Sequence, residues 1–258
     1  MLPESSFILR CKSEFEEVET NTITVELHET LPQPSRQNLS PLEIQQIESA
    51  TIGQMDNEKW KEYRKGRITA SNFYRVYTRT ETLKRHGGDA SKLVESLTGL
   101  SSPPENLGAL KYGRNMESAA KQKFIKVFQN EHKNTQYKEC GFFIHEEKQF
   151  IGATPDLVKC SCCGNGVVEI KCLYSIVNEN PSSQNLAYLV SDGDSVTLKE
   201  NHAYFCQIQG QMAVTKRNWS YFFLFTQKKK HIQKIHFNQT YWKKIEENLT
   251  WFHKNYLI

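Results

Sequence analysis

The feature of this sequence that most constrains its fold is a Pro-Asp pair ending at Asp156, followed after twelve residues by Glu169-Ile170-Lys171. Around the second motif, aliphatic and charged residues alternate, which is typical of a strand with one apolar face and one charged face. The Gly-Asn-Gly turn at residues 164–166 directly precedes this strand, so the segment between the motifs is predicted to form a β-hairpin. The hairpin would bring Asp156 close to Glu169.

This arrangement indicates a specific chemistry. Two neighbouring carboxylates repel each other unless a cation lies between them, and their hard oxygen atoms favour Mg²⁺ or Mn²⁺. A lysine beside a metal-bound water, here Lys171, can orient that water or help to deprotonate it. Together these groups predict metal-assisted hydrolysis of a phosphodiester. The simpler alternative is a solvated strand face, because Glu-x-Lys on a strand is common.

Length and composition indicate a globular protein with an N-terminal extension. The 258 residues are 38% hydrophobic, and residues 1–39 show no sustained pattern before a helix that is predicted to begin at Ser40-Pro41. We therefore expect an accessory, partly irregular leader at residues 1–55 and one domain at residues 56–258. No apolar run reaches the length of a membrane span, and no signal-peptide pattern begins the chain. The seven cysteines favour a reducing, intracellular setting, either cytoplasmic or nuclear.

Charge is distributed unevenly along the chain, although the net charge is only +4. Residues 1–55 carry three Lys or Arg against nine Asp or Glu, whereas residues 201–258 carry nine against two. The basic C-terminal part could face phosphates, or it could be an ordinary solvated surface.

Residues 60–71 predict a helix that ends at Gly66 and a second helix, from residue 72 to about 78, that Ser71 caps. The free N–H groups at the start of such a helix, with Arg64 and Arg67 just before it, would suit a phosphate. An ordinary corner between two helices with exposed arginines is the alternative.

A longer helix is predicted from about residue 105 to residue 129, with Glu117 in the middle of its apolar stripe. A carboxylate on an inward face is costly unless it is paired or bound to a metal. Lys121, one turn further, is a candidate partner. We favour a position near Asp156, at the metal site.

The cysteines near the hairpin could form a structural zinc site, for which the candidates are Cys160, Cys162, Cys163 and Cys172. Their Cys-x-Cys-Cys spacing differs from that of zinc ribbons and fingers. We therefore expect reduced thiols and no stoichiometric zinc.

The C-terminal part is predicted to contain a polar loop at residues 178–200 with one short helical piece at residues 186–190. A helix follows at residues 202–215, on which Gln207 and Gln211 share a face and could hydrogen-bond a phosphate or a water molecule. Residues 219–225 are apolar on both faces, as a strand at the centre of a sheet should be. A last helix begins after Asn238.

Five short motifs occur in an order that resembles the lambda exonuclease family, also called YqaJ-type viral recombinases, within the PD-(D/E)xK nuclease superfamily. They are Trp60…Arg64-x-Gly66-x-Ile68-Thr69-Ala70-Ser71, Leu110-x-x-Gly113…Glu117, Thr154-Pro155-Asp156, Glu169-Ile170-Lys171-Cys172 and Tyr204-x-x-Gln207-x-Gln209-x-x-Met212-x-Val214-Thr215. The resemblance spans about residues 56–226. It implies an α/β (α+β) fold with a restriction-endonuclease-like core, in which helices flank a central mixed β-sheet.

The resemblance also implies roles for individual residues. Asp156 and Glu169, with the Ile170 carbonyl, would ligate one metal ion, and Glu117 would hold a second. Lys171 would act on the attacking water. The residues that match the family's pocket for a 5′-terminal phosphate are Arg64, Ser71, Thr154 and Gln207. Leu173 stands where relatives often have Pro, and the three-cysteine insertion is absent from the phage enzyme.

The function that the resemblance implies is a Mg²⁺- or Mn²⁺-dependent exonuclease, with one or two ions, that digests linear duplex DNA from a 5′-phosphate end and leaves 3′ single strands for recombination and repair. Implied partners are DNA, a single-strand annealing protein and further copies of the chain in a ring-shaped homotrimer, without a membrane. An endonuclease of the same superfamily and a non-catalytic DNA-end-binding protein are the alternatives.

Overall fold

The computed structural model describes residues 32–35, 38–101, 108–129, 136–160, 166–193 and 195–258. Its helices are α1 (Pro41–Ala50), α2 (Glu58–Arg64), α3 (Phe73–His86), α4 (Ser91–Thr98), α5 (Gly108–Gln129), α6 (Ala203–Val214) and α7 (Gln239–Tyr256), with 3-10 turns η1 (Gln54–Asp56) and η2 (Ala70–Asn72). Its strands are β1 (Ile68–Thr69), β2 (Gln136–Lys138), β3 (Phe143–Ile144), β4 (Ile151–Ala153), β5 (Leu157–Cys160), β6 (Gly166–Cys172), β7 (Leu189–Asp192), β8 (Ser195–Leu198), β9 (Trp219–Phe225) and β10 (Lys230–His236).

A five-stranded mixed sheet forms the centre of the fold, in the order β10-β9-β6-β5-β2. The neighbouring strands β6 and β9 run parallel, and the other pairs are antiparallel. The predicted hairpin is confirmed as β5 and β6, with Leu157 opposite Val168. Its tip at residues 161–165 lies outside the described residues. The predicted central strand at residues 219–225 is also confirmed, because β9 lies between β6 and β10.

Helices cover both faces of this sheet, so the fold has three layers. On one face, Phe124 and its neighbours on α5 pack against aliphatic and aromatic side chains of β5, β6 and β9. On the other face, Ile208 and Met212 of α6 pack against the opposite sides of the same strands. The charged side of β6, with Glu169 and Lys171, therefore faces α6. The mixed α/β class with a central mixed sheet and flanking helices is confirmed.

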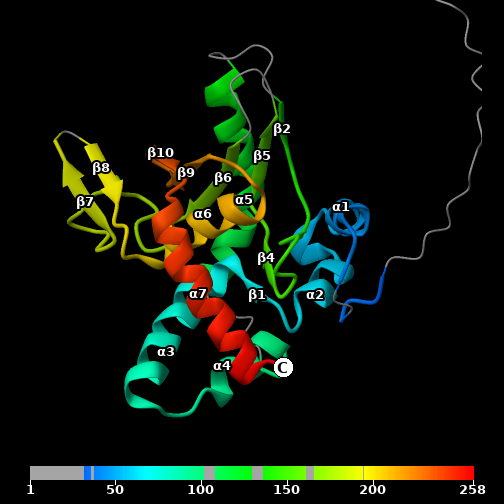
Figure 1. Ribbon diagram of the computed structural model, residues 1–258. Helices are drawn as coiled ribbons and strands as arrows, with labels where there is room; N and C mark the ends of the chain where they lie inside the picture. Colours follow the sequence, from blue (N-terminus) through cyan, green and yellow to red (C-terminus); the bar gives the residue numbers. More distant parts are fainter. Residues whose placement is uncertain (1–31, 36–37, 102–107, 130–135, 161–165, 194) are drawn as a thin grey trace, which may run out of the picture. The chain divides into compact units, whose positions relative to one another are not determined.

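A second apolar cluster lies beyond α6, where α7 crosses α3 and α4 (Figure 1). Trp242, Ile245 and Phe252 on the buried face of α7 contact Phe73 and other residues of α3. Asn238 caps α7 through a hydrogen bond from the Tyr241 backbone N–H, as its sequence predicts. This packing anchors the start of α3, which lies against α6.

A small sheet in the order β1-β4-β3 leads into the Pro-Asp motif. Gly152 on β4 is pressed against the ring of Phe142, and a Cβ atom at this position would lie 2.2 Å from the Phe142 Cζ atom. Only a glycine fits there without a shift of the backbone, and the close approach sets the path of the chain into Thr154 and Asp156. Helix α1, capped by Ser40 as predicted, packs its Ile47 into the same region.

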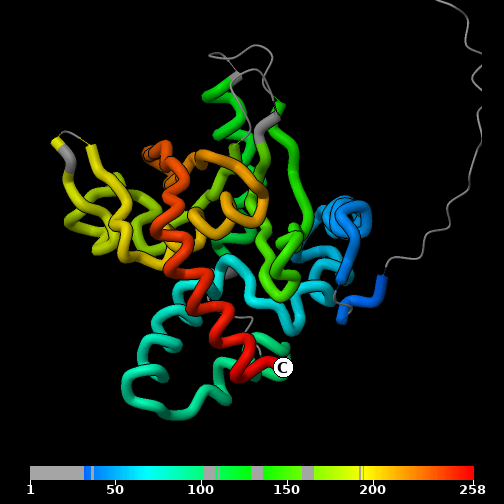
Figure 2. The backbone as a smooth tube through the Cα atoms, in the orientation of Figure 1, coloured from blue at the N-terminus to red at the C-terminus, as the bar shows by residue number. Residues whose placement is uncertain are grey.

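Two local predictions were wrong. Residues 186–190 do not form a helical piece, because β7 pairs with β8 in a two-stranded hairpin that projects from the sheet region (yellow in Figure 2). Ser71 is not the N-cap of a helix. It lies in the 3-10 turn η2, and α3 begins at Phe73 after Asn72, without a capping side-chain hydrogen bond.

None of the helices in the described part of the chain has both the length and the apolar character that a membrane crossing requires. The division of the chain at residue 55 stays a prediction.

Candidate active site

The site begins with Asp156 and the strand β6. The backbone N–H of Asp156 donates to the Val168 carbonyl at 3.1 Å, and the Ile170 N–H donates to Asp156 Oδ2 at 2.5 Å. These two bonds hold the Asp156 carboxylate against the backbone on either side of Glu169. The hairpin thus brings the two acidic residues together, as their spacing predicts.

Glu169 is almost completely buried, with 3% of its surface exposed. Three side chains donate to its carboxylate: Gln207 Nε2 at 2.7 Å, Gln211 Nε2 at 2.6 Å and Lys171 Nζ at 2.6 Å. Both glutamines lie on the face of α6 that packs on the sheet. A buried carboxylate needs such donors, because leaving it unpaired would cost several kcal/mol. Gln207 and Gln211 therefore position Glu169, a contact that sequence reasoning did not predict.

The electrostatics of the site favour a bound cation. Burial raises the pKa of Asp156 well above its usual range, and the negative charges of Glu169 and Glu117 raise it further. Lys171 and the Ile170 N–H oppose this rise in pKa only in part. A divalent cation at these oxygen atoms would relieve the repulsion and hold Asp156 ionised.

Lys171 is held between the carboxylates and an aromatic ring. Its Nζ lies 3.4 Å from Gln207 Oε1 and 4.7 Å from the centre of the Tyr204 ring. Burial lowers the pKa of Lys171, but Glu169 and Asp156 outweigh burial and raise it above its ordinary value. In this arrangement Lys171 is a cation at neutral pH.

Glu117 approaches the site from α5. It lines the same cleft as Asp156, but it is partly exposed and forms an ion pair with Lys121 at 2.8 Å. Glu117 thus pairs with Lys121, the candidate partner on its own helix, and it also lies at the edge of the cleft that contains Asp156. Lys121 also contacts Glu139 at 3.2 Å.

The cleft over these residues has a volume of about 580 Å³. Its walls include Tyr204, which belongs to one of the five motifs, and three residues that sequence reasoning missed, namely Tyr174, Tyr188 and Arg114. Tyr188 stacks on His202, and its hydroxyl has no hydrogen-bond partner among the described residues. Aromatic faces beside a polar floor suit a nucleotide base above a phosphate. Tyr174, Tyr188 and Arg114 lie far apart along the chain, so no spacing pattern in the sequence indicates that they share a site.

The metal ligands would come mainly from Asp156, Glu169 and the Ile170 carbonyl. Within the described residues, no three His, Cys, Asp or Glu side chains are grouped as a complete metal-binding set. Mg²⁺ rarely has such a set, since it usually keeps several waters and binds one or two carboxylates together with substrate phosphates. The oxygen donors and the raised pKa of Asp156 fit an ion of this kind.

Arg64 lies beside the site at the end of α2. Its guanidinium stacks on the Trp60 indole, 4.0 Å from the ring centre, and lies 5.9 Å from the Phe142 ring centre. Burial lowers the pKa of Arg64 to about 10, and no carboxylate within the described residues pairs with it. A desolvated cation without an anionic partner is a candidate anion site.

Trp60 links Arg64 to the centre of the site. Its indole N–H donates to Thr154 Oγ1 at 3.0 Å, and the Thr154 carbonyl accepts from Gln211 Nε2 at 3.3 Å. The Thr154 hydroxyl thus keeps its own proton to donate to a ligand. Ser71 is exposed on η2, and its Oγ lies 3.2 Å from Thr69 Oγ1. Gln207, the fourth predicted phosphate-binding residue, uses its side-chain N–H group to bind Glu169.

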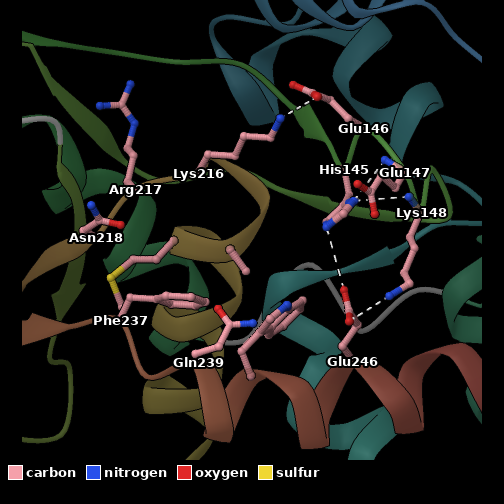
Figure 3. A pocket seen from close by; sticks show the side chains of 13 residues that line it. His145, Glu146, Glu147, Lys148, Lys216, Arg217, Asn218, Phe237, Gln239 and Glu246 are labelled. Carbon is pink, nitrogen blue, oxygen red and sulfur yellow. Dashed lines mark hydrogen bonds and ion pairs between the residues drawn. The ribbon is translucent and has the colours of Figure 1, made fainter.

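A separate hollow of about 440 Å³ lies between the β3–β4 turn, the end of α6 and α7 (Figure 3). Its charges are largely matched: Lys148 pairs with Glu246 at 2.7 Å, and Lys216 pairs with Glu146 at 2.5 Å. Burial lowers the pKa of His145, so its imidazole is neutral at pH 7. The first pair connects α7 to the β3–β4 turn, and the second connects the end of α6 to the same turn. Asp156, Glu169 and Lys171 line the other cleft.

The cysteines of the hairpin can be followed only in part. Cys162, Cys163 and the side chain of Cys160 lie outside the described residues. Cys172 is a free thiol, and burial, with the nearby charges of Asp156 and Glu117, raises its pKa to about 12. The expectation of no stoichiometric zinc stays a prediction.

The fold and the carboxylate–lysine cleft together define a restriction-endonuclease-like protein. The YqaJ-like viral recombinase domain matches residues 59–218, and the chain belongs to this family. This match confirms the resemblance inferred from the five motifs.

Several solved structures share the fold at low sequence identity. An alkaline exonuclease (LHK-Exo) from Laribacter hongkongensis is 21% identical, with a TM-score of 0.54, and the match covers 77% of this chain and 91% of that protein. A phage-related exonuclease from Haemophilus somnus 129PT is 15% identical, with a TM-score of 0.51 and coverage of 74% and 93%. SOX in a complex with DNA is 11% identical, with a TM-score of 0.55 and coverage of 84% and 73%. No curated protein matches the chain.

Proposed function

We propose that this protein is a Mg²⁺-dependent deoxyribonuclease that digests duplex DNA from 5′ ends and leaves 3′ single strands for recombination. The observation that supports this most is the pair of carboxylates, half-buried Asp156 and buried Glu169, beside Lys171 in an open cleft. Membership of the YqaJ-like viral recombinase family and a fold shared with exonucleases support a phosphodiester substrate.

Each residue of the cleft has a distinct role in this proposal. Asp156 and Glu169, with the Ile170 carbonyl, would hold one Mg²⁺ or Mn²⁺ ion, and Glu117 would contribute to a second. When bound, such an ion polarises the phosphate and lowers the pKa of the attacking water. Lys171 orients the water and offsets negative charge that develops on the phosphate.

A comparison of DNA substrates tests the reaction type. The purified protein with Mg²⁺ should digest linear duplex DNA and leave covalently closed circular DNA intact, because an exonuclease needs an end. Cleavage of the closed circle would instead favour an endonuclease of the same superfamily. Binding to DNA ends without cleavage in Mg²⁺ or Mn²⁺ would favour a non-catalytic end-binding protein.

Recognition of the 5′ end is assigned to Arg64 and its neighbours. The guanidinium is desolvated without a carboxylate, and the Thr154 hydroxyl, linked to it through Trp60, has a proton to donate. A terminal phosphate carries more negative charge than an internal one, so it would gain more from a buried cation. Anchoring that phosphate would also fix which bond reaches Asp156 and Glu169.

A duplex with a 5′-phosphate should therefore be digested faster than the same duplex with a 5′-hydroxyl. In Arg64→Ala this preference should shrink by about 1.5–3 kcal/mol, the scale of a charge-assisted hydrogen bond, or roughly tenfold to a hundredfold in rate ratio. Arg85→Ala is the matched control, because Arg85 is exposed and pairs with Glu81. A wild-type ratio near one, or an unchanged ratio in Arg64→Ala, would contradict this assignment.

Assembly of the chain into a homotrimeric ring is likewise a proposal. Light scattering of the purified protein should show a mass three times that of the 30.0 kDa chain. A monomer at the concentrations of the nuclease assay would exclude the ring.

A further inference from the structure

A group of lysines surrounds a second hollow, separate from the catalytic cleft. This hollow has a volume of about 550 Å³ and lies between α5 and the turn that joins β9 to β10. Lys123 approaches from α5, Lys228 and Lys229 come from the turn, and Lys230 is the first residue of β10. All four are exposed. We call this group the lysine hollow.

The charge of the lysine hollow is not neutralised by the described residues. No carboxylate lines it, and none of its four lysines forms an ion pair within the described part of the chain. Like charges around one hollow repel each other, and a polyanion would remove this cost. The hollow of Figure 3 differs in this respect, because its lysines have glutamate partners.

The turn that carries Lys228 and Lys229 and leads into Lys230 is fixed to the fold. Thr226 is buried, and its Oγ1 accepts from the Lys229 N–H at 2.9 Å and lies 3.0 Å from the Glu179 carbonyl. The Gln227 N–H donates to the Val177 carbonyl at 3.1 Å. The backbone under the lysines is therefore pre-organised, so less conformational entropy of this turn is lost when a ligand binds.

The lysine hollow and the catalytic cleft both border α5. Arg114 lines the cleft and Lys123 lines the hollow, and both are exposed on this helix. Nine positions, or about two and a half turns, separate them, so they lie about 14 Å apart along the helix axis and on different sides of the helix. Glu117 is the sole acidic residue of α5, and it is paired with Lys121.

The β-sheet also places the two hollows near each other. Phe225, at the edge of the hollow, lies opposite Cys172 on the parallel strand β6, and Cys172 directly follows Lys171. A polyanion seated at Lys171 would need to extend only a few nucleotides to reach the hollow. A nucleic acid that leaves the cleft at this end of the strands would pass close to the hollow, which favours nucleic acid over an acidic peptide.

We propose that the lysine hollow is a second nucleic-acid contact, which binds the phosphate backbone of a substrate several nucleotides from the scissile bond. This inference rests on the proposed nuclease function, because it requires that the catalytic cleft holds the end of the same nucleic-acid molecule. The backbone could belong to the duplex that has not yet been digested or to the released single strand, and salt dependence distinguishes the two.

The test is the binding of labelled DNA without catalysis, measured by fluorescence anisotropy in EDTA over a range of salt concentrations. In K228Q/K229Q/K230Q, the plot of the logarithm of the binding constant against the logarithm of the salt concentration should become less steep. The magnitude of its slope should decrease by about 0.9 per lost phosphate contact for duplex DNA, or about 0.7 for a single strand. Up to three contacts are removed, and K123Q, on a different element, should lower the slope by about one contact. A loss seen with only one of the two forms identifies which backbone is bound.

The matched control is K92Q/K243Q/K254Q, which removes the same charge from exposed lysines that lie outside the lysine hollow. It should leave the slope within about one contact of the wild type, and the thermal unfolding of each variant verifies its folding. An equal fall in slope in both triple variants, or no fall in K228Q/K229Q/K230Q, would overturn the proposal. Binding of an acidic peptide that requires these lysines, with the DNA slope unchanged, would overturn it too.

A nuclease assay in Mg²⁺ separates this proposal from the proposed function. In K228Q/K229Q/K230Q, KM for a long duplex should rise about tenfold or more at moderate salt with kcat unchanged, because the lysines do not touch the reacting atoms. If the wild type binds DNA through these lysines but cleaves none, the surface stands and the nuclease function fails. If it cleaves DNA with the same KM in wild type and variant, the nuclease stands and the surface fails.

Discussion

Asp156→Asn should abolish metal-dependent cleavage while leaving DNA binding largely intact, and Asp156→Ala and Glu169→Ala should do the same. In the proposed function these carboxylates hold an ion, whereas contacts with the nucleic acid would come from Arg64 and the lysine hollow. Single-turnover cleavage and anisotropy on the same preparations measure the two effects. Substantial Mg²⁺-dependent turnover in any of these purified variants would contradict the assignment of the metal ligands.

The stability of the metal-free variants provides an independent check on Asp156. Its folded-state pKa is raised by burial and by Glu169 and Glu117, so its ionisation costs folding free energy. The stability that protonated Asp156 contributes is present below the unfolded-state pKa of about 4, and it is lost as pH rises through the folded pKa. In EDTA, Asp156→Asn should therefore be as stable as the wild type near pH 4 and more stable at pH 7.

The isosteric change at Glu169 should act in the opposite direction. Glu169 accepts from Gln207, Gln211 and Lys171, and a glutamine amide would turn an N–H group toward one of these donors. A buried donor without an acceptor costs about 1–3 kcal/mol. Glu169→Gln should thus lower the melting temperature at pH 7 in EDTA, whereas Asp156→Asn raises it. A change in melting temperature of the same sign in both variants would show that the electrostatic environments assigned to Asp156 and Glu169 are wrong.

Those features of the site that depend on local pattern could be predicted from the sequence. Alternation around Glu169 and a Gly-rich turn were sufficient to predict the β5–β6 hairpin and the nearness of Asp156 to Glu169. Capping residues such as Ser40 and Asn238 marked the starts of α1 and α7, because a cap is a local interaction.

Other features depend on how distant elements pack, and the sequence could not predict them. Gln207 and Gln211 were expected to face a ligand, but the crossing of α6 over β6 directs them to Glu169. Arg64 was expected beside an exposed helix start, but it stacks on Trp60 in a desolvated position. The β7–β8 hairpin was missed because its short, polar strands carry little periodicity.

Lys171→Ala should lower the rate of cleavage by about 10²–10⁴-fold, the scale of losing a general base or a charge-stabilising donor. The Lys171 Nζ is the cation closest to Glu169, at 2.6 Å, and it is confined by Gln207 and the Tyr204 ring. Lys171→Met keeps most of the side-chain volume without the charge, so it should be as slow as the alanine variant. Lys234→Met is the control, since Lys234 is exposed on β10 and stacks on Trp219.

The Lys171→Arg variant tests whether activity needs the compact ammonium group of lysine or only a positive charge at this position. A planar guanidinium is larger than an ammonium and cannot reach one carboxylate oxygen in the same confined space without moving Tyr204 or Gln207. Because the carboxylates raise the pKa of Lys171, the native group is already a full cation, and arginine adds no charge that lysine lacks. The arginine variant should therefore regain little of the rate if geometry at the water and the phosphate decides activity. A rate near that of the wild type would show that Lys171 only neutralises the two carboxylates, and the orienting role proposed for it would be wrong.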